Sequence, residues 1–504
     1  MTVPSAKDQI HFIGFDLGTS GARISIIENN KEESISASAN ANTSYNEVHS
    51  DSIQYSKYDD PEAWTDAIHS LLQKTPSHLL SSTKAICVSG TSASCLLVDS
   101  VTGKVTRSPK MYDYDITHQQ SDPTAHIKAQ ELIDEYVPKE HATRAPTSAL
   151  SKLLHYEYCK TMSQSEVLAH QSEYVANTIF LSNPTKCGAG DIMNKREYVS
   201  DWHNALKLGY DVRNLCYPSW LKKCLAEANI DEGVLPKVVA PGEVIGTVSS
   251  TVSKSYGIHS DAVVVGGTTD SNAAFVAATA TDGVPTYGTA VTSLGSTLAI
   301  KMLSRSYVES SSQGVYSHRF PVFGQRNNKQ QQQKEEKEAW LIGGASNVGC
   351  AVLRKENFSN EELVELSKEM NVMEDSPLKY YPLTKKGERF PIADGSKEPI
   401  LTPKPESRAE YLKGILQGIS SVEKQAFEVL GLLGANPSYP DMVWTCGGGS
   451  NNPAWIQMRQ RLLQNRPDGE ATANDNEEVR VKVMKANDSE ASFGAAVLAA
   501  SSFC

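Results

Sequence analysis

The chemistry suggested by this sequence begins at Asp16, which stands just before a turn rich in glycine and hydroxyl groups. In IGFDLGTSGARISII, residues 13–27, Asp16 comes shortly before Gly18, Thr19 and Ser20. Glycine lets backbone N–H groups approach phosphate oxygens, and the two hydroxyls add donors. A carboxylate would repel phosphate unless a cation lay between them, and Mg²⁺ is commonly held by carboxylates together with phosphates. The pattern predicts a phosphate-binding loop with Asp16 as metal ligand; the alternative is a tight hairpin turn.

A second acidic residue, Asp270, follows an apolar segment in GGTTDSNAAF, residues 266–275. The run AVVVGG indicates a strand, and the small residues after Asp270 indicate the start of a helix. Asp at a helix start is commonly an N-cap. Beside phosphate-binding turns, the better interpretation is a general base that takes a proton from a substrate hydroxyl.

Two further turns could contact a nucleotide. The segment SLGST contains Gly295, Ser296 and Thr297, and its composition echoes that of the first turn. The segment TCGGGSNNPAW has three consecutive glycines, against which a flat base could lie. Its candidate contacts are Gly448, Gly449, Asn452 and Trp455. The sequence has no GxxxxGK[ST] loop and no GxGxxG motif after its first strand, so a nucleotide would need another scaffold.

Short apolar runs that end in glycine-rich turns alternate with helical patterns along the chain. The runs, each expected to be a buried strand, are HFIGFDL, KAICVSG, AVVVGG, AVTSL, WLIGG and MVWTC. The spacing of apolar and small residues predicts helices over 60–74, 408–434 and 487–503. Alternating strands and helices predict an α/β fold.

The similarity between GTSGA, residues 18–22, and SLGST predicts a duplicated hairpin and two domains. We expect residues 1–277 to form the first domain and residues 278–487 the second. The helix within 488–504 is expected to pack back on the first domain. Two polar inserts are expected to be exposed loops: residues 325–339 and residues 465–478.

The composition of the chain indicates which classes of partner and which cellular compartment to expect. The 504 residues carry a formal charge of −11, which argues against nucleic acid or an anionic membrane as the main partner. Nine cysteines without Cys-x-x-Cys spacing predict free thiols in a reducing compartment. No run has the length of a membrane span, and the first ten residues lack a signal or transit pattern. We expect a cytoplasmic location, with a plastid as the alternative if a transit peptide precedes this chain; monomer and homodimer both stay open.

The order of these motifs resembles that of the FGGY carbohydrate kinases. The motifs DLGTSG, GGTTD, SLGST, GGASN, GERFPI, GGGSNN and EASFGAA follow the family's order from Ile13 to about Ala500. The resemblance implies two actin-like (ribonuclease H-like) ATPase domains with an interdomain cleft. It also implies Mg-ATP and a small sugar or polyol as the partners.

The resemblance further implies roles for single residues. Asp270 matches the family's catalytic base, and Asp16 matches the aspartate that positions metal and sugar. Ser92, in SGTSASCLLVD, matches a sugar-contacting serine of the ribulokinase-like group, and Gly344 lies in the GGASN segment that reaches the nucleotide. The other implied ATP contacts are Gly18, Thr19, Ser20, Gly295, Ser296, Thr297, Gly448, Gly449, Asn452 and Trp455.

Residues 89–99 and 200–211 resemble the plant and cyanobacterial sugar kinases assigned as D-ribulokinases. This resemblance implies transfer of a phosphoryl group from ATP to the C5 hydroxyl of D-ribulose. The nearest alternative is a D-xylulokinase on the same scaffold. An actin- or chaperone-like ATPase and a non-catalytic sugar sensor are the alternatives from other classes.

The polar residues of SDWHNALKLG are expected to serve the fold more than the chemistry. Asp201 and Asn204 are predicted to cap the helix around NALKLG. His203 is predicted to be a half-buried, hydrogen-bonded histidine, with contact to the sugar as the alternative. Lys207 is predicted to be a charge in solvent.

Overall fold

The computed structural model describes residues 9–30, 44–118, 124–139, 141–181, 196–280, 285–321, 338–464, 481–487 and 490–503. The chain divides into two compact units. The first unit contains the described residues between 9 and 280 together with 490–503, and the second contains those between 285 and 487. Apart from residues 338 and 339, both polar inserts lie outside the described residues.

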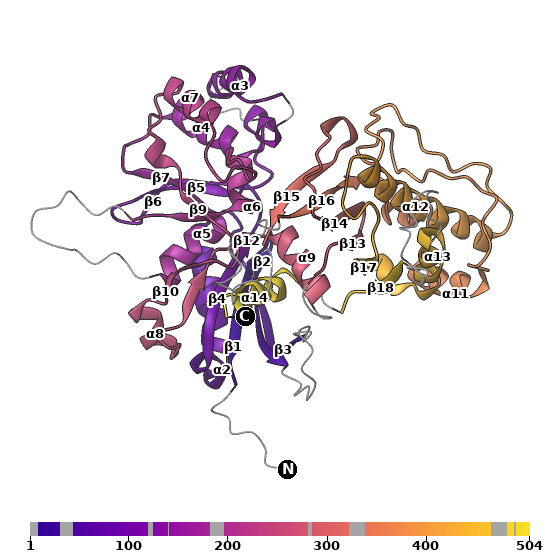
Figure 1. The fold of residues 1–504 in the computed structure, drawn as a ribbon, viewed down its shortest axis with the longest axis horizontal. Coiled ribbons are helices and arrows are strands. Elements are labelled where there is room, and N and C mark those ends of the chain that lie inside the picture. Colours follow the sequence, from indigo (N-terminus) through magenta and orange to yellow (C-terminus); the bar gives the residue numbers. More distant parts are fainter. Residues whose placement is uncertain are drawn as a thin grey trace, which may run out of the picture. The chain divides into compact units, whose positions relative to one another are not determined.

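The first unit is built on a mixed sheet with the strand order β10-β11-β4-β1-β2-β3, and β12 also pairs with β4 (Figure 1). Strand β1 is antiparallel to β2 and parallel to β4, while β11 and β12 are parallel to β4. The strands are β1 (His11–Leu17), β2 (Gly21–Asn30), β3 (Ser44–Gln54), β4 (Thr83–Gly90), β10 (Val244–Thr247), β11 (Val263–Val265) and β12 (Thr268–Thr269).

A second apolar core of the first unit lies among a three-stranded sheet, with the order β6-β5-β7, and helices α3, α4 and α7. The strands are β5 (Cys95–Asp99), β6 (Val105–Lys110) and β7 (Glu166–His170), and a parallel pair is formed by β8 (Val199–Asp201) and β9 (Lys237–Val239). The helices of the unit are α1 (Pro61–Lys74), α2 (Ser77–Ser81), α3 (Ala125–Tyr136), α4 (Ala149–Cys159), α5 (Gln171–Val175), α6 (Trp202–Ala205), α7 (Ser219–Glu227), α8 (Ser250–Tyr256), α9 (Asp270–Ala280) and α14 (Ala491–Ser501).

The second unit contains a six-stranded sheet with the order β15-β16-β14-β13-β17-β18. Its strands are β13 (Thr289–Leu294), β14 (Leu298–Ser304), β15 (Tyr316–Phe320), β16 (Ala339–Ser346), β17 (Met442–Cys446) and β18 (Lys482–Lys485). Its helices are α10 (Ala351–Lys355), α11 (Asn360–Glu369), α12 (Arg408–Leu432) and α13 (Pro453–Gln464).

The two units repeat one sheet topology. The series β3-β2-β1-β4-β11 in the first unit corresponds to β16-β14-β13-β17-β18 in the second. In both series the first two pairings are antiparallel and the last two are parallel. The duplicated hairpin predicted from GTSGA and SLGST is therefore confirmed, as the β1–β2 pair and the β13–β14 pair.

Local sequence explains the helices that were predicted. Helix α1 begins at Pro61, whose missing N–H costs nothing at that position, and Asp60 accepts a hydrogen bond of 3.0 Å from the backbone N–H of Glu62. Trp64, Ile68 and Leu71 then bury one face of the helix. Helices α1, α12 and α14 confirm the predicted segments to within a few residues at their ends.

Helix α14 packs against β1 and α9 (Figure 1). Most of its residues are small, so the backbones approach closely. A Cβ atom added at Gly494 would lie 1.8 Å from the carbonyl oxygen of Ala273 in α9. A Cβ atom added at Gly14 in β1 would lie 2.0 Å from the carbonyl oxygen of Ser492. Any side chain at either glycine would therefore force α14 away from the first unit's sheet or from α9.

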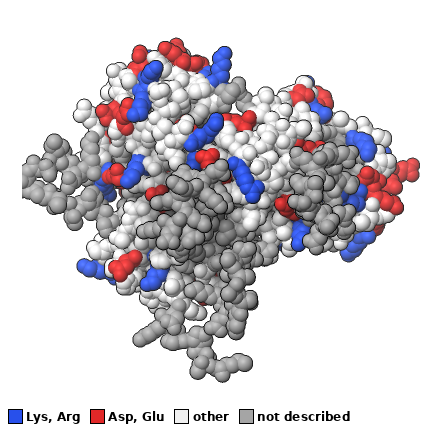
Figure 2. Space-filling view, viewed as in Figure 1, with Lys and Arg blue, Asp and Glu red and all other residues white. Residues whose placement is uncertain are grey.

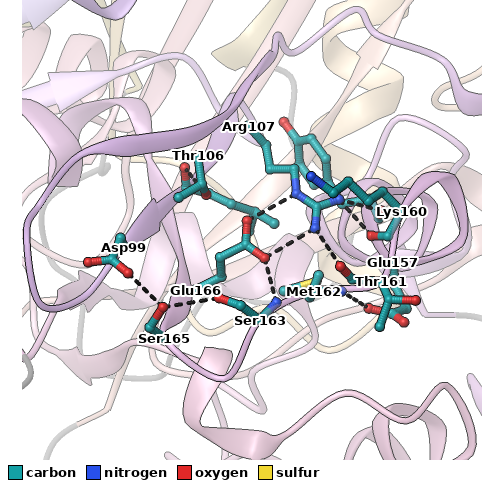
Figure 3. Close-up of polar contacts among 12 residues, drawn as sticks. Asp99, Thr106, Arg107, Glu157, Lys160, Thr161, Met162, Ser163, Ser165 and Glu166 are labelled. Carbon is teal, nitrogen blue, oxygen red and sulfur yellow. Dashed lines mark hydrogen bonds and ion pairs between the residues drawn. The ribbon is translucent and has the colours of Figure 1, made fainter.

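Helix α4 is fixed at its C-terminal end by a partly buried ion pair (Figure 3). Arg107 of β6 donates two hydrogen bonds, of 3.0 and 3.1 Å, to the carboxylate of Glu166 in β7. The same guanidinium donates to the carbonyl oxygens of Tyr156 and Lys160 at 2.9 and 2.7 Å, and to that of Thr161 at 3.0 Å. The guanidinium therefore satisfies three carbonyl oxygens at the end of α4 and ties this end to β6 and β7.

We expect Arg107→Met to lower the free energy of unfolding of the first unit by about 3 kcal/mol, because it leaves Glu166 buried without its partner. The side chains of Arg107 and Glu166 are only 12% and 5% exposed. Urea unfolding measures the change. The matched control is Lys222→Met, which removes a half-exposed ion pair with Glu232 and is expected to change little. Equal effects of both variants would contradict the structural role assigned to Arg107.

Candidate active site

Asp16 lies near the carboxyl end of β1, between two neighbouring strands that set its orientation. Its register partners are Arg23 in β2 and Ser89 in β4. Ser89 Oγ donates a hydrogen bond of 2.9 Å to Asp16 Oδ1, and Arg23 Nη1 lies 3.1 Å from Oδ2. The Asp16 side chain is 4% exposed. Both supporting residues were missed in the sequence, although a hairpin turn at residues 18–20 places Arg23 opposite Asp16.

The turn after Asp16 exposes its hydroxyl groups. Gly18 N–H donates 3.0 Å to the carbonyl oxygen of Gly21, which closes the hairpin between β1 and β2. The side chains of Thr19 and Ser20 are exposed at its tip. A hairpin of this kind can present hydroxyl donors and backbone amides to a phosphate.

Asp270 and Ser92 follow strand ends next to that of Asp16. Strand β12 pairs in parallel with the last residues of β4, so Asp270, the first residue of α9, lies just beyond this pairing. Ser92 comes two residues after the end of β4 and is half-buried. In open α/β sheets, ligands bind beyond the carboxyl ends of parallel strands. The fold thus brings Asp16, Ser92 and Asp270 to the same edge of one sheet.

The charges at this edge are incompletely balanced. Burial raises the pKa of Asp16 to about 6, and the negative charge of Asp270 acts in the same direction. The hydrogen bond from Ser89 and the charge of Arg23 lower the Asp16 pKa without cancelling these two effects. A cation or a hydroxyl donor beside Asp16 would therefore be stabilised by the carboxylate.

Lys207 is the residue whose surroundings differ most from the prediction. It is half-buried in a short 3-10 helix, Leu206–Leu208, rather than free in solvent. Burial lowers the pKa of Lys207, and the negative charge of Asp270 opposes this shift. A cationic side chain thus acts on the second acidic residue of the site. The local sequence around NALKLG gives no sign of this, because the burial comes from distant segments.

Two other polar residues of the same segment, Asp201 and His203, form buried hydrogen bonds next to the site. Asp201 caps α6, as predicted, by accepting hydrogen bonds from the backbone of His203 and Asn204 at 2.8 and 3.1 Å. His203 is fully buried, and its Nδ1 lies 2.7 Å from Thr268 Oγ1. Since Thr268 belongs to the strand that leads to Asp270, these contacts fix the start of α9.

The second unit places its candidate phosphate loop at the turn between β13 and β14. Gly295 N–H donates 3.2 Å to the carbonyl oxygen of Thr297, and the side chains of Ser296 and Thr297 are exposed. Arg354 of α10 donates a hydrogen bond of 3.0 Å to Ser296 Oγ, so an exposed cation also stands at this turn.

The glycine turn after β17 lies next to this loop. A Cβ atom added at Gly447, where φ is +83°, would lie 2.7 Å from the carbonyl oxygen of Leu294, and Gly448 has open space beside it. Asn452 Oδ1 accepts a hydrogen bond of 3.1 Å from the backbone N–H of Trp455, and its Nδ2 donates 2.8 Å to Ser367 Oγ. The second unit therefore brings two of its predicted nucleotide-binding turns together.

Trp455 and Gly344 lie inside the second unit rather than on its surface. The indole of Trp455 is 1% exposed, and its N–H donates to Ser420 Oγ at 2.9 Å. A Cβ atom added at Gly449 would lie 2.7 Å from the Trp455 ring, so this ring supports the glycine turn from behind. Gly344 is buried within β16, where a Cβ atom would lie 2.7 Å from the ring of Phe390.

Two other kinds of functional feature are not found among the described residues. They contain no group of three His, Cys, Asp or Glu side chains placed to hold a metal ion. None of the described helices combines the length and apolar character that crossing a membrane requires. On the face drawn in Figure 2, Lys and Arg side chains of the described part are interspersed with Asp and Glu.

Solved sugar and polyol kinases share this fold over nearly the whole chain. A glycerol kinase from Plasmodium falciparum with ADP has a TM-score of 0.69 and 15% identity, covering 98% of this chain and 90% of that one. A gluconate kinase from Lactobacillus acidophilus has a TM-score of 0.67 and 17% identity, with coverage of 98% and 90%. A xylulose kinase from Rhodospirillum rubrum has a TM-score of 0.67 and 18% identity, with coverage of 97% and 89%.

The family follows from a match to sequence rather than from fold alone. The family model described as the N-terminal domain of the FGGY family of carbohydrate kinases matches residues 11–277, more than half of the chain. The fold is accordingly the mixed α/β fold of these sugar kinases, with two actin-like ATPase domains. The chain belongs to the FGGY family of carbohydrate kinases, which use ATP as co-substrate.

Proposed function

We propose that this kinase transfers the γ-phosphoryl group of Mg-ATP to the C5 hydroxyl of D-ribulose, which yields D-ribulose 5-phosphate and ADP. The observation that carries the proposal is the placement of Asp16, Ser92 and Asp270 beyond neighbouring strand ends of one sheet. The choice of D-ribulose rests on the resemblance of residues 89–99 and 200–211 to D-ribulokinases. D-xylulose is the second candidate, because xylulose kinases are among the solved structures of this fold.

Asp270 acts as the general base in this proposal. Its carboxylate takes the proton of the C5 hydroxyl while that oxygen forms a bond to the γ-phosphorus. The bond between the γ-phosphorus and the bridging oxygen breaks, and ADP leaves with that oxygen. The nearby charge of Lys207 favours the ionised carboxylate, which is the form that can accept the proton.

Asp16 has the donor set for a cation that also carries phosphates. Its carboxylate is buried and only partly neutralised, and Ser89 and Arg23 fix its two oxygens. Mg²⁺ bound there would neutralise negative charge on the phosphates of ATP. Asp16 and Ser92 are also proposed to bond sugar hydroxyls and so orient C5 toward the base.

Each unit by itself offers candidate nucleotide contacts. In the first unit we assign Gly18, Thr19 and Ser20 to the phosphates. In the second unit we assign the turns containing Gly295, Ser296, Thr297, Gly448, Gly449 and Asn452 to the nucleotide. Trp455 of α13 and Gly344 of β16, both buried, are proposed to support these turns from inside the unit. We propose that residues 1–277, with 488–504, form the sugar-binding domain and residues 278–487 the nucleotide-binding domain.

Free thiols at all seven described cysteines are compatible with the cytoplasmic location that we propose.

The proposed reaction is tested by ADP release with Mg-ATP across D-ribulose, D-xylulose, L-ribulose, sedoheptulose and glycerol. We expect the highest kcat/KM with D-ribulose. Asp270→Asn should lower kcat roughly 10²–10⁴-fold, because it removes the base, while ATP binding changes little. The control is Asp261→Asn, at a well-exposed residue of the same unit. Preference for another sugar would correct the substrate, and ADP release that ignores every sugar would overturn the kinase mechanism.

Asp16→Asn is expected to abolish most activity while raising the stability of the ligand-free protein. The folded-state pKa of Asp16 is raised from 3.8 to about 6, so the folded protein binds more protons than the unfolded chain between these values. Its stability therefore falls as the pH rises through this window, and the full cost is present above pH 6. That cost is about 3 kcal/mol at pH 7.5, from a shift of about 2 units in the cited pKa.

Thermal unfolding of wild type and Asp16→Asn at pH 4 and pH 7.5 measures this effect. The variant should gain several degrees in Tm at pH 7.5 and less at pH 4. Asp66→Asn, at an exposed position of α1, is the control and should change neither value. A variant that loses stability equally at both pH values would show that the Asp16 charge is already fully compensated in the free protein.

A further inference from the structure

The turn that carries Ser92 is held by hydrogen bonds on both sides of that residue. Thr91 donates from its backbone N–H and its hydroxyl to Gln171 Oε1, at 3.3 and 2.9 Å. Ser94 Oγ accepts a hydrogen bond of 2.9 Å from the backbone N–H of Tyr112. Among the described residues, by contrast, no partner contacts the Ser92 hydroxyl. The residues on either side of Ser92 are therefore held in place, and the Ser92 hydroxyl is available to a ligand.

Ala93, the residue after Ser92, has an unfavourable backbone conformation. Its φ is +63°, in the left-handed region, although it carries a Cβ atom and is buried. Such a conformation persists only when the surrounding structure determines it, and it is often found where a functional group must be held in place. Some interaction must therefore hold the Ala93 peptide in this orientation.

Lys152 of α4 supplies one such interaction, in addition to the hydrogen bond of 3.3 Å from the backbone N–H of Ser94 to the carbonyl oxygen of Thr91. Its Nζ donates to the carbonyl oxygen of Ala93 at 2.8 Å and to that of Met111 at 2.6 Å. The Lys152 side chain is 0% exposed, and within the described residues it forms no ion pair. Burial lowers its pKa to about 8, so the protein keeps a costly group where an apolar side chain would pack without penalty.

Helix α4, which carries Lys152, is fixed at both of its ends. Ser148 caps α4 by accepting a hydrogen bond of 3.0 Å from the backbone N–H of Ser151. At the other end, Arg107 bonds the carbonyl oxygens of Tyr156 and Lys160 (Figure 3). A rigid helix therefore presents the ammonium group to the turn.

We infer that Lys152 is a positioning residue for the sugar: by holding the Ala93 peptide in its left-handed conformation, it directs the Ser92 hydroxyl toward the substrate. The inference rests on the proposed function, in which Ser92 contacts the sugar. Lys152 itself touches no substrate atom in this arrangement. Its loss should weaken sugar binding and leave the nucleotide sites of the second unit unaffected.

The test compares KM for D-ribulose and KM for ATP in a set of variants, using the preferred ketose if the panel identifies another. Lys152→Met should raise the sugar KM at least tenfold and change the ATP KM less than twofold. Ala93→Gly alone should be close to wild type. Combined with Lys152→Met it should recover most of the sugar KM, because glycine adopts the left-handed conformation without a penalty. A purely structural role for Lys152 would not give this rescue.

Lys110→Met is the matched control, because Lys110 is also a buried lysine, with a pKa lowered to about 8, but it bonds Tyr114 and His155 instead of the turn. Its sugar KM should stay near that of wild type. If Lys152→Met does not fold, Ala93→Val serves instead, since a β-branched residue disfavours this conformation, and it should raise the sugar KM in the same way.

Ser92→Ala distinguishes the sugar contact of Ser92 from the positioning role of Lys152. An unchanged sugar KM in Ser92→Ala would overturn the sugar contact in the proposed function. A raised sugar KM in Ser92→Ala, together with an unchanged one in Lys152→Met or Ala93→Val, would overturn the positioning role alone. Lack of rescue by Ala93→Gly would also overturn it.

Discussion

The close approach of α14 to β1 and α9 is the constraint on which the proposed active site most depends. Gly494 and Gly14 allow contact between backbones that would be impossible with any side chain at these positions. Ser492 of α14 also bonds Ser25 of β2 at 2.8 Å through their hydroxyls. As a result, a segment at the far end of the chain fixes both the strand that carries Asp16 and the helix that begins with Asp270. Packing at this density leaves little freedom for either carboxylate to move.

The charge of Asp16 is balanced less completely than that of the buried ion pair between Arg459 and Glu423. In the second unit, the fully buried Arg459 bonds both oxygens of Glu423 and also Thr445, so its charge is completely paired. Asp16 has weaker compensation and keeps a raised pKa. The incompletely balanced carboxylate lowers the stability of the folded protein, and we propose that it is retained because the site uses its charge.

The sequence predicts those parts of the structure that depend on neighbouring residues. The β1–β2 and β13–β14 hairpins, the strands before each glycine turn and helices α1, α12 and α14 all follow from local patterns. The burial of Lys207 and the two contacts of Lys152 do not, because their partners lie tens of residues away in the chain. Trp455 is a similar case. Its position shortly after a glycine turn in the sequence suggested contact with a nucleotide base, whereas its indole N–H donates a hydrogen bond to a carbonyl oxygen of the long helix α12.

The repeated sheet topology gives a physical reason for the single metal site that we propose. In the first unit the hairpin reads Asp16-Leu17-Gly18, and in the second the corresponding residues are Ser293-Leu294-Gly295. Both turns can offer backbone amides and hydroxyls to phosphates, but only the first has a carboxylate before them. An acidic residue at the second position would repel a phosphate, whereas serine adds a donor without charge. One copy of the duplicated hairpin therefore suits a cation and a sugar hydroxyl in addition to phosphates, and the other suits phosphates alone.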